Sequence, residues 1–236
     1  MAPPGYATMP PPGYAPMAPP GYAPMAPQGY VPITVAPSGS GKIALWAIIL
    51  TGAYAAALIL NAVMAPAMVE GLKQQLAHPQ NASTFGGQSP ATYLGIAVEI
   101  ASYVLLALWM QRIRNARKAH GEVVGGPPAV EWWGWFVPFA GFVLPFLGMR
   151  AITKARAGMG LLLGWWIAFV AAGVVSVASV VAESRAIDFS TGKLAHPEAL
   201  DPIVGILWAS AILMVVSWVF LAMIIRVTTR LQAEVS

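Results

Sequence analysis

The sequence contains no cysteine and few charged residues. Without cysteine, the 236-residue chain cannot form a disulfide or supply a thiolate as a nucleophile or metal ligand. Charged residues make up 9% of the chain and hydrophobic residues 58%, whereas soluble domains average about 25% charged residues. So few charges cannot cover a surface that faces water. The composition therefore predicts an integral membrane protein and leaves no room for a large soluble domain.

Recognisable catalytic and ligand-binding motifs are also lacking. The chain has no G-x-S-x-G nucleophile motif, no Walker loop and no dinucleotide fingerprint. Its three histidines, His78, His120 and His196, fall in predicted loops and do not have metal-ligand spacing. We therefore expect no catalytic site, no cofactor, no metal ion and no nucleic-acid partner.

The first 32 residues consist of four eight-residue repeats, MAPPGYAT, MPPPGYAP, MAPPGYAP and MAPQGYVP. Proline fixes φ and the repeat offers no apolar face, so we expect a disordered tail with polyproline II character over residues 1–41. One tyrosine stands at the same place in each repeat: Tyr6, Tyr14, Tyr22 and Tyr30. The Pro-Pro-Gly-Tyr units are similar to the PPxY ligands of WW domains. The tail is therefore either a multivalent docking site for a cytoplasmic protein or, as its composition favours, a spacer.

Four long apolar runs follow the tail. Each has about 20 residues, which is enough for a helix to cross the roughly 30 Å hydrocarbon core of a bilayer. We expect spanning helices at about 43–64, 92–111, 159–182 and 203–225, within a membrane domain over residues 42–230 and before a short tail, 231–236. Gly52-x-x-x-Ala56 and Gly160-x-x-x-Gly164 offer small surfaces on which neighbouring helices can pack closely.

A fifth apolar stretch, about 131–150, does not fit a further span. Pro138 and Pro145 interrupt it, and proline breaks a helix unless other groups satisfy the backbone. Basic residues flank it on both sides, and lysine and arginine mark the cytoplasmic face. We therefore expect a segment that re-enters the membrane from the cytoplasm or lies along the interface. The predicted fold class is all-α, with four transmembrane helices and this Trp- and Pro-rich segment.

The distribution of basic residues supports this topology. With four spans and both termini in the cytoplasm, ten basic residues lie inside: Lys42, Arg112, Arg114, Arg117, Lys118, Arg150, Lys154, Arg156, Arg226 and Arg230. Three lie outside: Lys73, Arg185 and Lys193. A five-span arrangement would move Arg150, Lys154 and Arg156 to the outer face and lose this bias. The positive-inside rule therefore favours four spans with cytoplasmic termini.

Glu99 is the only acidic residue in any predicted span. Charged side chains near the bilayer centre are costly, and they are usually buried in a bundle or functional. Counted along their helices, Glu99, Ser176 and Ser210 fall at a similar depth, so a Glu–Ser–Ser polar layer is possible. One interpretation is a proton relay or an ion site. The other, favoured because no partner charge is present, is a hydrogen-bonded carboxyl group that fixes helix register.

Tryptophans gather next to the predicted basic clusters. These are Trp132, Trp133, Trp135, Trp165 and Trp166. Tryptophan is enriched at membrane interfaces, so we expect an interfacial anchor rather than a ligand cage. The neighbouring basic residues either set the topology alone or also attract anionic lipid headgroups.

The central part of the chain resembles a bacterial membrane family, catalogued as domain of unknown function 4328. The residues that carry the resemblance are the run 109–115 (WMQRIRN), a Gly/Pro linker, the run 135–138 (WFVP), Pro145 and the pair Trp165-Trp166. The resemblance extends over roughly residues 45–230. The family pattern continues as N-x-x-x-P-Y, but here Gly141 and Phe146 replace the two polar residues. The resemblance implies a multi-pass protein of the bacterial envelope and carries no assigned activity.

Together these features predict a bacterial inner-membrane protein that is not an enzyme. The leading hypothesis is a scaffold or accessory protein whose tail recruits an unknown cytoplasmic protein. Its bundle would pack against a second copy of the chain or against another membrane protein. The alternative is a small transporter or channel-like protein that uses Glu99.

Overall fold

The computed structural model describes residues 40–77, 90–135, 140–153, 157–188, 190–191 and 193–233. These residues all belong to one compact unit, Pro37–Ser236. The repeat tail with its four tyrosines lies outside the described residues. Pro138, Lys154 and Arg156 also lie outside them.

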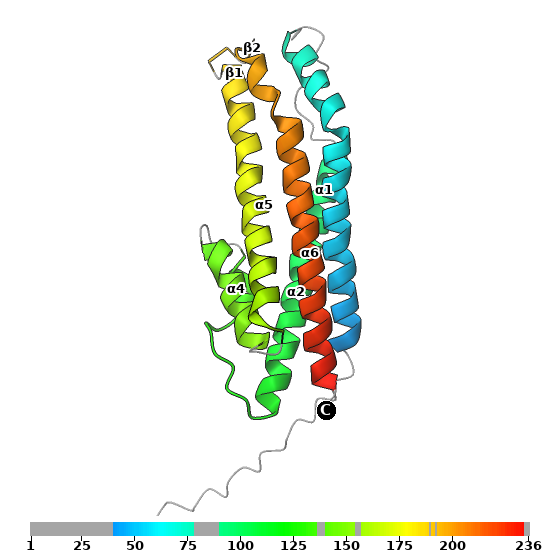
Figure 1. Ribbon diagram of the computed structural model, residues 1–236, viewed down its shortest axis with the longest axis vertical. Helices are drawn as coiled ribbons and strands as arrows, with labels where there is room; N and C mark the ends of the chain where they lie inside the picture. The colour runs from blue at the N-terminus through cyan, green and yellow to red at the C-terminus, as the bar shows by residue number, and fades with distance from the viewer. Residues whose placement is uncertain are drawn as a thin grey trace, which may run out of the picture. The chain divides into compact units, whose positions relative to one another are not determined.

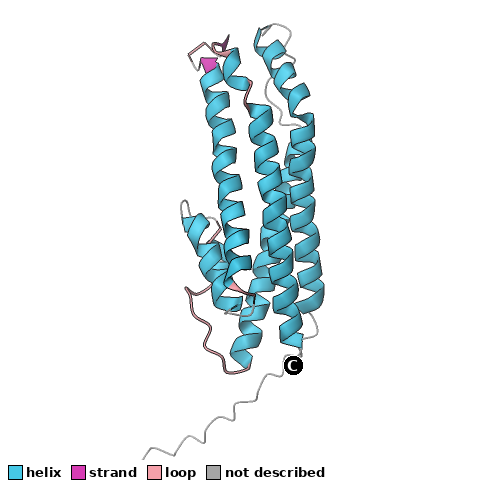
Figure 2. Cartoon of the chain, viewed as in Figure 1, coloured by secondary structure: helices cyan, strands magenta, loops and turns pink. Residues whose placement is uncertain are grey.

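Four long helices make up most of the described structure (Figures 1 and 2). They are α1 (Ser40–Ala77), α2 (Pro90–Ala119), α5 (Met159–Ala186) and α6 (Ile203–Ala233). Each is long and apolar enough to cross a membrane. The prediction of an all-helical protein with four long apolar helices is confirmed at this level.

All four long helices are longer than predicted, and α1 exceeds its predicted bounds the most. The first helix was predicted to span about 43–64, but it passes through Pro66 and continues to Ala77. Beyond the proline, Val69 and Leu72 pack against a small cluster formed by the ends of α5 and α6. Lys73 also forms an ion pair of 2.7 Å with Asp201. These contacts offset the backbone hydrogen bond that proline cannot make.

The connection between α5 and α6 contains two short strands and a helical turn. β1 (Ile187–Asp188) and β2 (Lys193–Leu194) pair antiparallel, and η2 (Pro197–Leu200) leads into α6. The side chain of Asp188 organises the tight turn, because its carboxylate accepts hydrogen bonds from the Ser190 backbone and hydroxyl and from the Thr191 hydroxyl.

Close helix contacts rely on glycine. α2 packs along α1, α1 along α6, and α6 along α5. A Cβ atom added to Gly52 would lie 2.9 Å from the Trp218 ring, and one added to Gly164 would lie 2.9 Å from the Phe220 ring. Both glycines therefore let an aromatic side chain of α6 approach a neighbouring backbone. Trp218 also donates a 3.0 Å hydrogen bond to the carbonyl oxygen of Ile48 on α1.

A helical hairpin connects α2 to α5. It consists of α3 (Val130–Trp133) and α4 (Ala140–Thr153), after a Gly- and Pro-rich linker. Cβ positions at Gly134 and Gly148 lie 3.2 Å from Leu144 and 3.1 Å from Val130, respectively, so the two arms run antiparallel. Pro145 stands inside α4 and does not break it. As the sixth residue of α4, it removes one backbone hydrogen bond, the one that an N–H here would donate to the Gly141 carbonyl oxygen.

The hairpin lies beside one half of α5 (Figure 1). The start of α4 is fixed at Phe142, whose carbonyl oxygen accepts a 2.5 Å hydrogen bond from Trp166. The ring of Phe142 reaches Gly173, where an added Cβ would be 3.3 Å away. Gly173 lies near the middle of α5, about 21 Å along the helix from Met159 at 1.5 Å per residue. The hairpin therefore extends about half the length of α5.

Candidate functional site

A cavity of about 50 Å³ lies between the four long helices. All four helices contribute to its lining, and the hairpin adds Trp135. Its polar lining comes from α1, α2 and α6: Thr51, Tyr54, Glu99, Ser102, Tyr103 and Ser217. We call it the central cavity. It contains the one acidic residue that the sequence places in a span.

Glu99 lies beside two tyrosines. The hydroxyl of Tyr103, one turn further along α2, donates a 3.1 Å hydrogen bond to its carboxylate. Tyr54 on α1 lines the same cavity. The carboxylate therefore has a donor on its own helix that the bilayer core cannot provide, and it faces α1 across the cavity.

Trp135 closes the central cavity on the side of the hairpin. Its ring stacks on Tyr103 with centroids 5.3 Å apart, and meets Phe169 of α5 edge-on at 6.0 Å. Its ring nitrogen donates a 3.1 Å hydrogen bond to the carbonyl oxygen of Glu131. The hairpin thus inserts an aromatic side chain between α2 and α5, next to the Glu99–Tyr103 pair.

Two buried arginines of α2 hold the hairpin and its linker. Arg114 forms a buried ion pair with Glu131 of α3 and donates to the carbonyl oxygen of Gly125 at 3.3 Å. Arg117 pairs with Glu122 at 2.7 Å. A further nitrogen of Arg117 donates to the last carbonyl oxygens of α4, at 3.0 Å to Ala151 and 2.5 Å to Ile152. At the C-terminal end of α4, the positive charge of Arg117 satisfies carbonyl oxygens that lack a partner within the helix, and it complements the helix dipole.

A family model described as Domain of unknown function (DUF4328) matches residues 88–233. The chain belongs to this family. The match begins just before α2 and includes the hairpin, α5 and α6. It therefore contains Glu99, Tyr103 and Trp135, but not Tyr54 on α1. No curated protein matches the chain, and no solved structure does.

Within the DUF4328 segment, the serines lie apart from Glu99. The hydroxyls of Ser176 and Ser210 are 2.8 Å apart, and both contact the carbonyl oxygen of Ala172. Neither lines the central cavity. The expected Glu–Ser–Ser layer is therefore corrected to two separate groups. The reason is the order of packing: α2 pairs with α1, so its carboxylate meets tyrosines, whereas the serines join α5 to α6.

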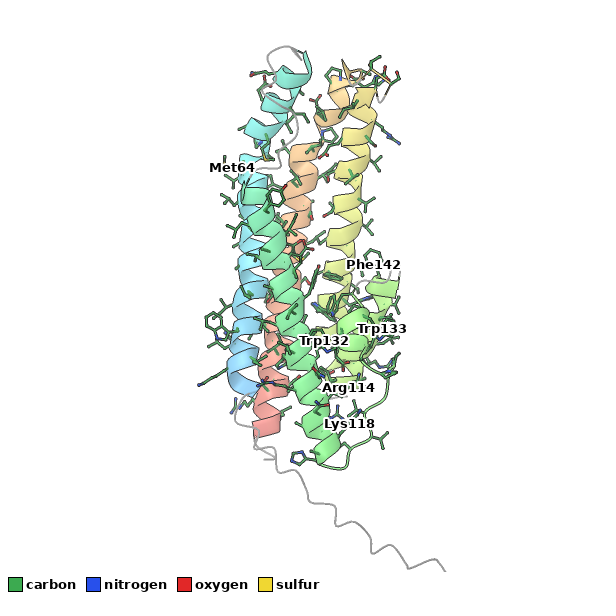
Figure 3. The ribbon with its side chains drawn as sticks, turned by 180° about the vertical axis from the view of Figure 1, so that it is seen from behind. Met64, Arg114, Lys118, Trp132, Trp133 and Phe142 are labelled. Atoms are coloured by element: carbon green, nitrogen blue, oxygen red, sulfur yellow. The ribbon has the colours of Figure 1, made fainter. Side chains whose placement is uncertain are left out.

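The five tryptophans proposed as interfacial anchors occupy different environments. Trp132 and Trp133 lie on α3, close to the basic end of α2 that Figure 3 marks with Arg114 and Lys118. Trp133 is exposed, Trp135 lines the cavity, and Trp166 is half-buried. Trp165 is buried in the core. It falls on the inward face of α5 with Leu162, Ala168 and Ala172, at helical spacing.

Sequence reasoning missed the roles of Arg114, Arg117 and the tyrosines. The arginines looked like markers of the cytoplasmic face, yet both side chains are buried. The i, i+4 spacing of Glu99 and Tyr103 was a readable signal of contact along one helix. Tyr54 could not be found in this way, because its contact depends on how α1 packs against α2.

Proposed function

We propose that this protein is a non-enzymatic membrane scaffold or accessory subunit. The observation that supports this proposal best is the small volume of the central cavity, about 50 Å³. Pockets for organic ligands usually measure about 300–1,000 Å³. The carboxylate that lines the cavity already receives a hydrogen bond from Tyr103 of its own helix, beside Tyr54 of α1. Glu99 therefore acts as a structural group where two helices pack.

In this proposal the protein resides in the bacterial cytoplasmic membrane with both termini in the cytoplasm. The start of α1 and the end of α6 lie at the same end of the bundle, as do Arg114 and Lys118 (Figures 1 and 3). Lysine and arginine favour the cytoplasmic side. The α3–α4 hairpin then enters from the cytoplasmic face, reaches the middle of the bilayer and returns. Trp135, near its tip, fills the space between the spanning helices.

The Pro-Pro-Gly-Tyr repeats are the part of the chain proposed to recruit a cytoplasmic partner. The bundle would hold the repeats at the membrane and would pack against another membrane protein or a second copy. The test compares the full chain with a chain lacking residues 1–32, both purified from cells in mild detergent. A scaffold requires a protein that copurifies in stoichiometric amount with the full chain only. Identical copurifying proteins for both chains would contradict the docking role.

A second candidate is a proton or small-cation pathway through Glu99. The observation that favours it is a carboxylate lining a cavity with hydroxyl groups from three helices. Reconstituted vesicles separate the two candidates. A pathway predicts a proton or cation leak that Glu99→Gln abolishes, with the melting midpoint unchanged. The scaffold proposal predicts the same low leak for both proteins.

A further inference from the structure

A second hollow, of about 620 Å³, lies between the linker that follows α2, helix α4 and the start of α5. Its lining residues are Val123, Gly125, Gly126, Pro127, Leu147, Arg150, Ala151 and Met159. We call it the linker hollow. It shares no lining residue with the central cavity. Its linker wall follows the basic end of α2, which Figure 3 marks with Arg114 and Lys118.

The charges around the linker hollow favour an anion. Arg150 is exposed and lines it. Among the described residues, Arg150 has no ion-pair partner. The two nearby carboxylates do not line the hollow: Glu122 pairs with Arg117, and Glu131 pairs with Arg114. An anion in this hollow would therefore meet a guanidinium group without a competing carboxylate.

A second arginine lies behind the wall of the hollow. The Nη2 atom of Arg114 is buried and has no hydrogen-bond partner in the described structure. It lies 3.7 Å from the point that a Cβ atom on Gly126 would occupy. Gly126 has φ +96°, which favours glycine, and it leaves this point empty. A buried N–H donor without a partner is costly, and this one lies just behind the hollow without lining it.

Apolar side chains beside the hollow point to a lipid rather than a free ion. Val123 is 88% exposed, Met159 46% and Leu147 40%. Exposed Trp133 lies on the adjacent helix α3, and tryptophan prefers the headgroup level of a membrane. A phospholipid presents its phosphate next to apolar acyl chains and matches both features. A hydrated inorganic ion would gain nothing from the apolar rim.

We propose that the linker hollow binds the phosphate group of an anionic membrane phospholipid. Arg150 donates hydrogen bonds from the rim, while Arg114 holds the linker from behind through Glu131 and the Gly125 carbonyl oxygen. Arginine forms charge-assisted hydrogen bonds with phosphate in a favourable planar geometry. The linker, α4 and α5 then close around one lipid headgroup at the cytoplasmic end.

The test titrates the delipidated full chain in detergent with phosphatidylglycerol or phosphatidylcholine and counts bound lipids by native mass spectrometry. Arg150→Gln should weaken the first phosphatidylglycerol site about fivefold or more, as expected for one arginine near an anionic headgroup. Arg226→Gln is the matched control, because Arg226 is also exposed but does not line the hollow. It should change this affinity less than about twofold. Phosphatidylcholine binding should be the same for all three proteins.

A second variant keeps the test valid if Arg150→Gln does not fold. Val123→Glu places a carboxylate at a position of the hollow that is 88% exposed and should also weaken phosphatidylglycerol binding. The proposal is overturned if Arg150→Gln or Val123→Glu, when folded, binds phosphatidylglycerol as the unaltered chain does. It is also overturned if Arg226→Gln loses as much affinity, since charge alone would then explain binding. Competition by inorganic phosphate at equal concentration would identify a free anion as the ligand and exclude the lipid.

Discussion

The buried pair of Arg114 and Glu131 provides the sharpest test of how the hairpin is held. The two side chains are 7% and 2% exposed. Removing one partner leaves the other charge buried and unpaired, which typically costs about 3–5 kcal/mol. We therefore expect Arg114→Met and Glu131→Leu each to lower the free energy of unfolding by about this amount. The loss should appear as a lower melting midpoint of the detergent-purified chain, followed by tryptophan fluorescence.

The double variant separates charge pairing from simple packing. Arg114→Met combined with Glu131→Leu removes both charges and fills the site with apolar atoms, a replacement that is often neutral or stabilising. It should recover most of the stability lost in either single variant. The matched control is Arg117→Met, which leaves the Arg114 pair intact but removes donors to the end of α4. The proposed charge pairing would be refuted if the losses of unfolding free energy simply added in the double variant. It would also be refuted if each single variant lost less than about 1 kcal/mol.

The remaining predictions concern the helix bundle and the turn between β1 and β2. Glu99→Gln should be mild because an amide keeps a similar shape, whereas Glu99→Leu should cost about 0.6–2 kcal/mol for the lost hydrogen bond from Tyr103, measured as a shift in melting midpoint. Gly52→Val should cost about 1–3 kcal/mol because its side chain would meet Trp218; an unchanged midpoint would contradict that contact. The hydroxyl and N–H groups of Ser190 hold the pKa of Asp188 below its ordinary value. The resulting stability is present above the ordinary pKa and lost as pH falls through the lowered one. An Asp188→Asn variant should therefore show a flatter dependence of melting midpoint on pH in that acidic range.

The number of long helices could be predicted from the sequence because it depends on the length of apolar runs. Each run is long enough for a span, and tertiary packing is not needed to recognise it. Helix ends were less predictable. Pro66 is a helix breaker by local rules, yet packing of Val69 and Leu72 against other elements extends α1 beyond it. Local rules fail where contacts from distant parts of the chain stabilise an unfavourable residue.

The candidate site was predictable only in part. Glu99 stands out by charge alone, and its neighbour Tyr103 is visible from helical spacing. Tyr54 also lines the central cavity, but it lies near Glu99 only because α1 packs against α2, and no local sequence pattern specifies that packing. The ion pair between Arg114 and Glu131 was also hidden. Those residues are 17 positions apart across a Gly- and Pro-rich linker, so their contact depends on the fold of the hairpin.

The buried ion pair and the central cavity are parts of one arrangement. Glu131 pairs with Arg114 through its carboxylate, while its carbonyl oxygen accepts the hydrogen bond from the Trp135 ring nitrogen. The same residue therefore fixes α3 against α2 and orients the ring that stacks on Tyr103. Tyr103 in turn donates to Glu99. A change at the Arg114 pair should consequently alter the environment of Glu99, although no atom of that pair lines the cavity.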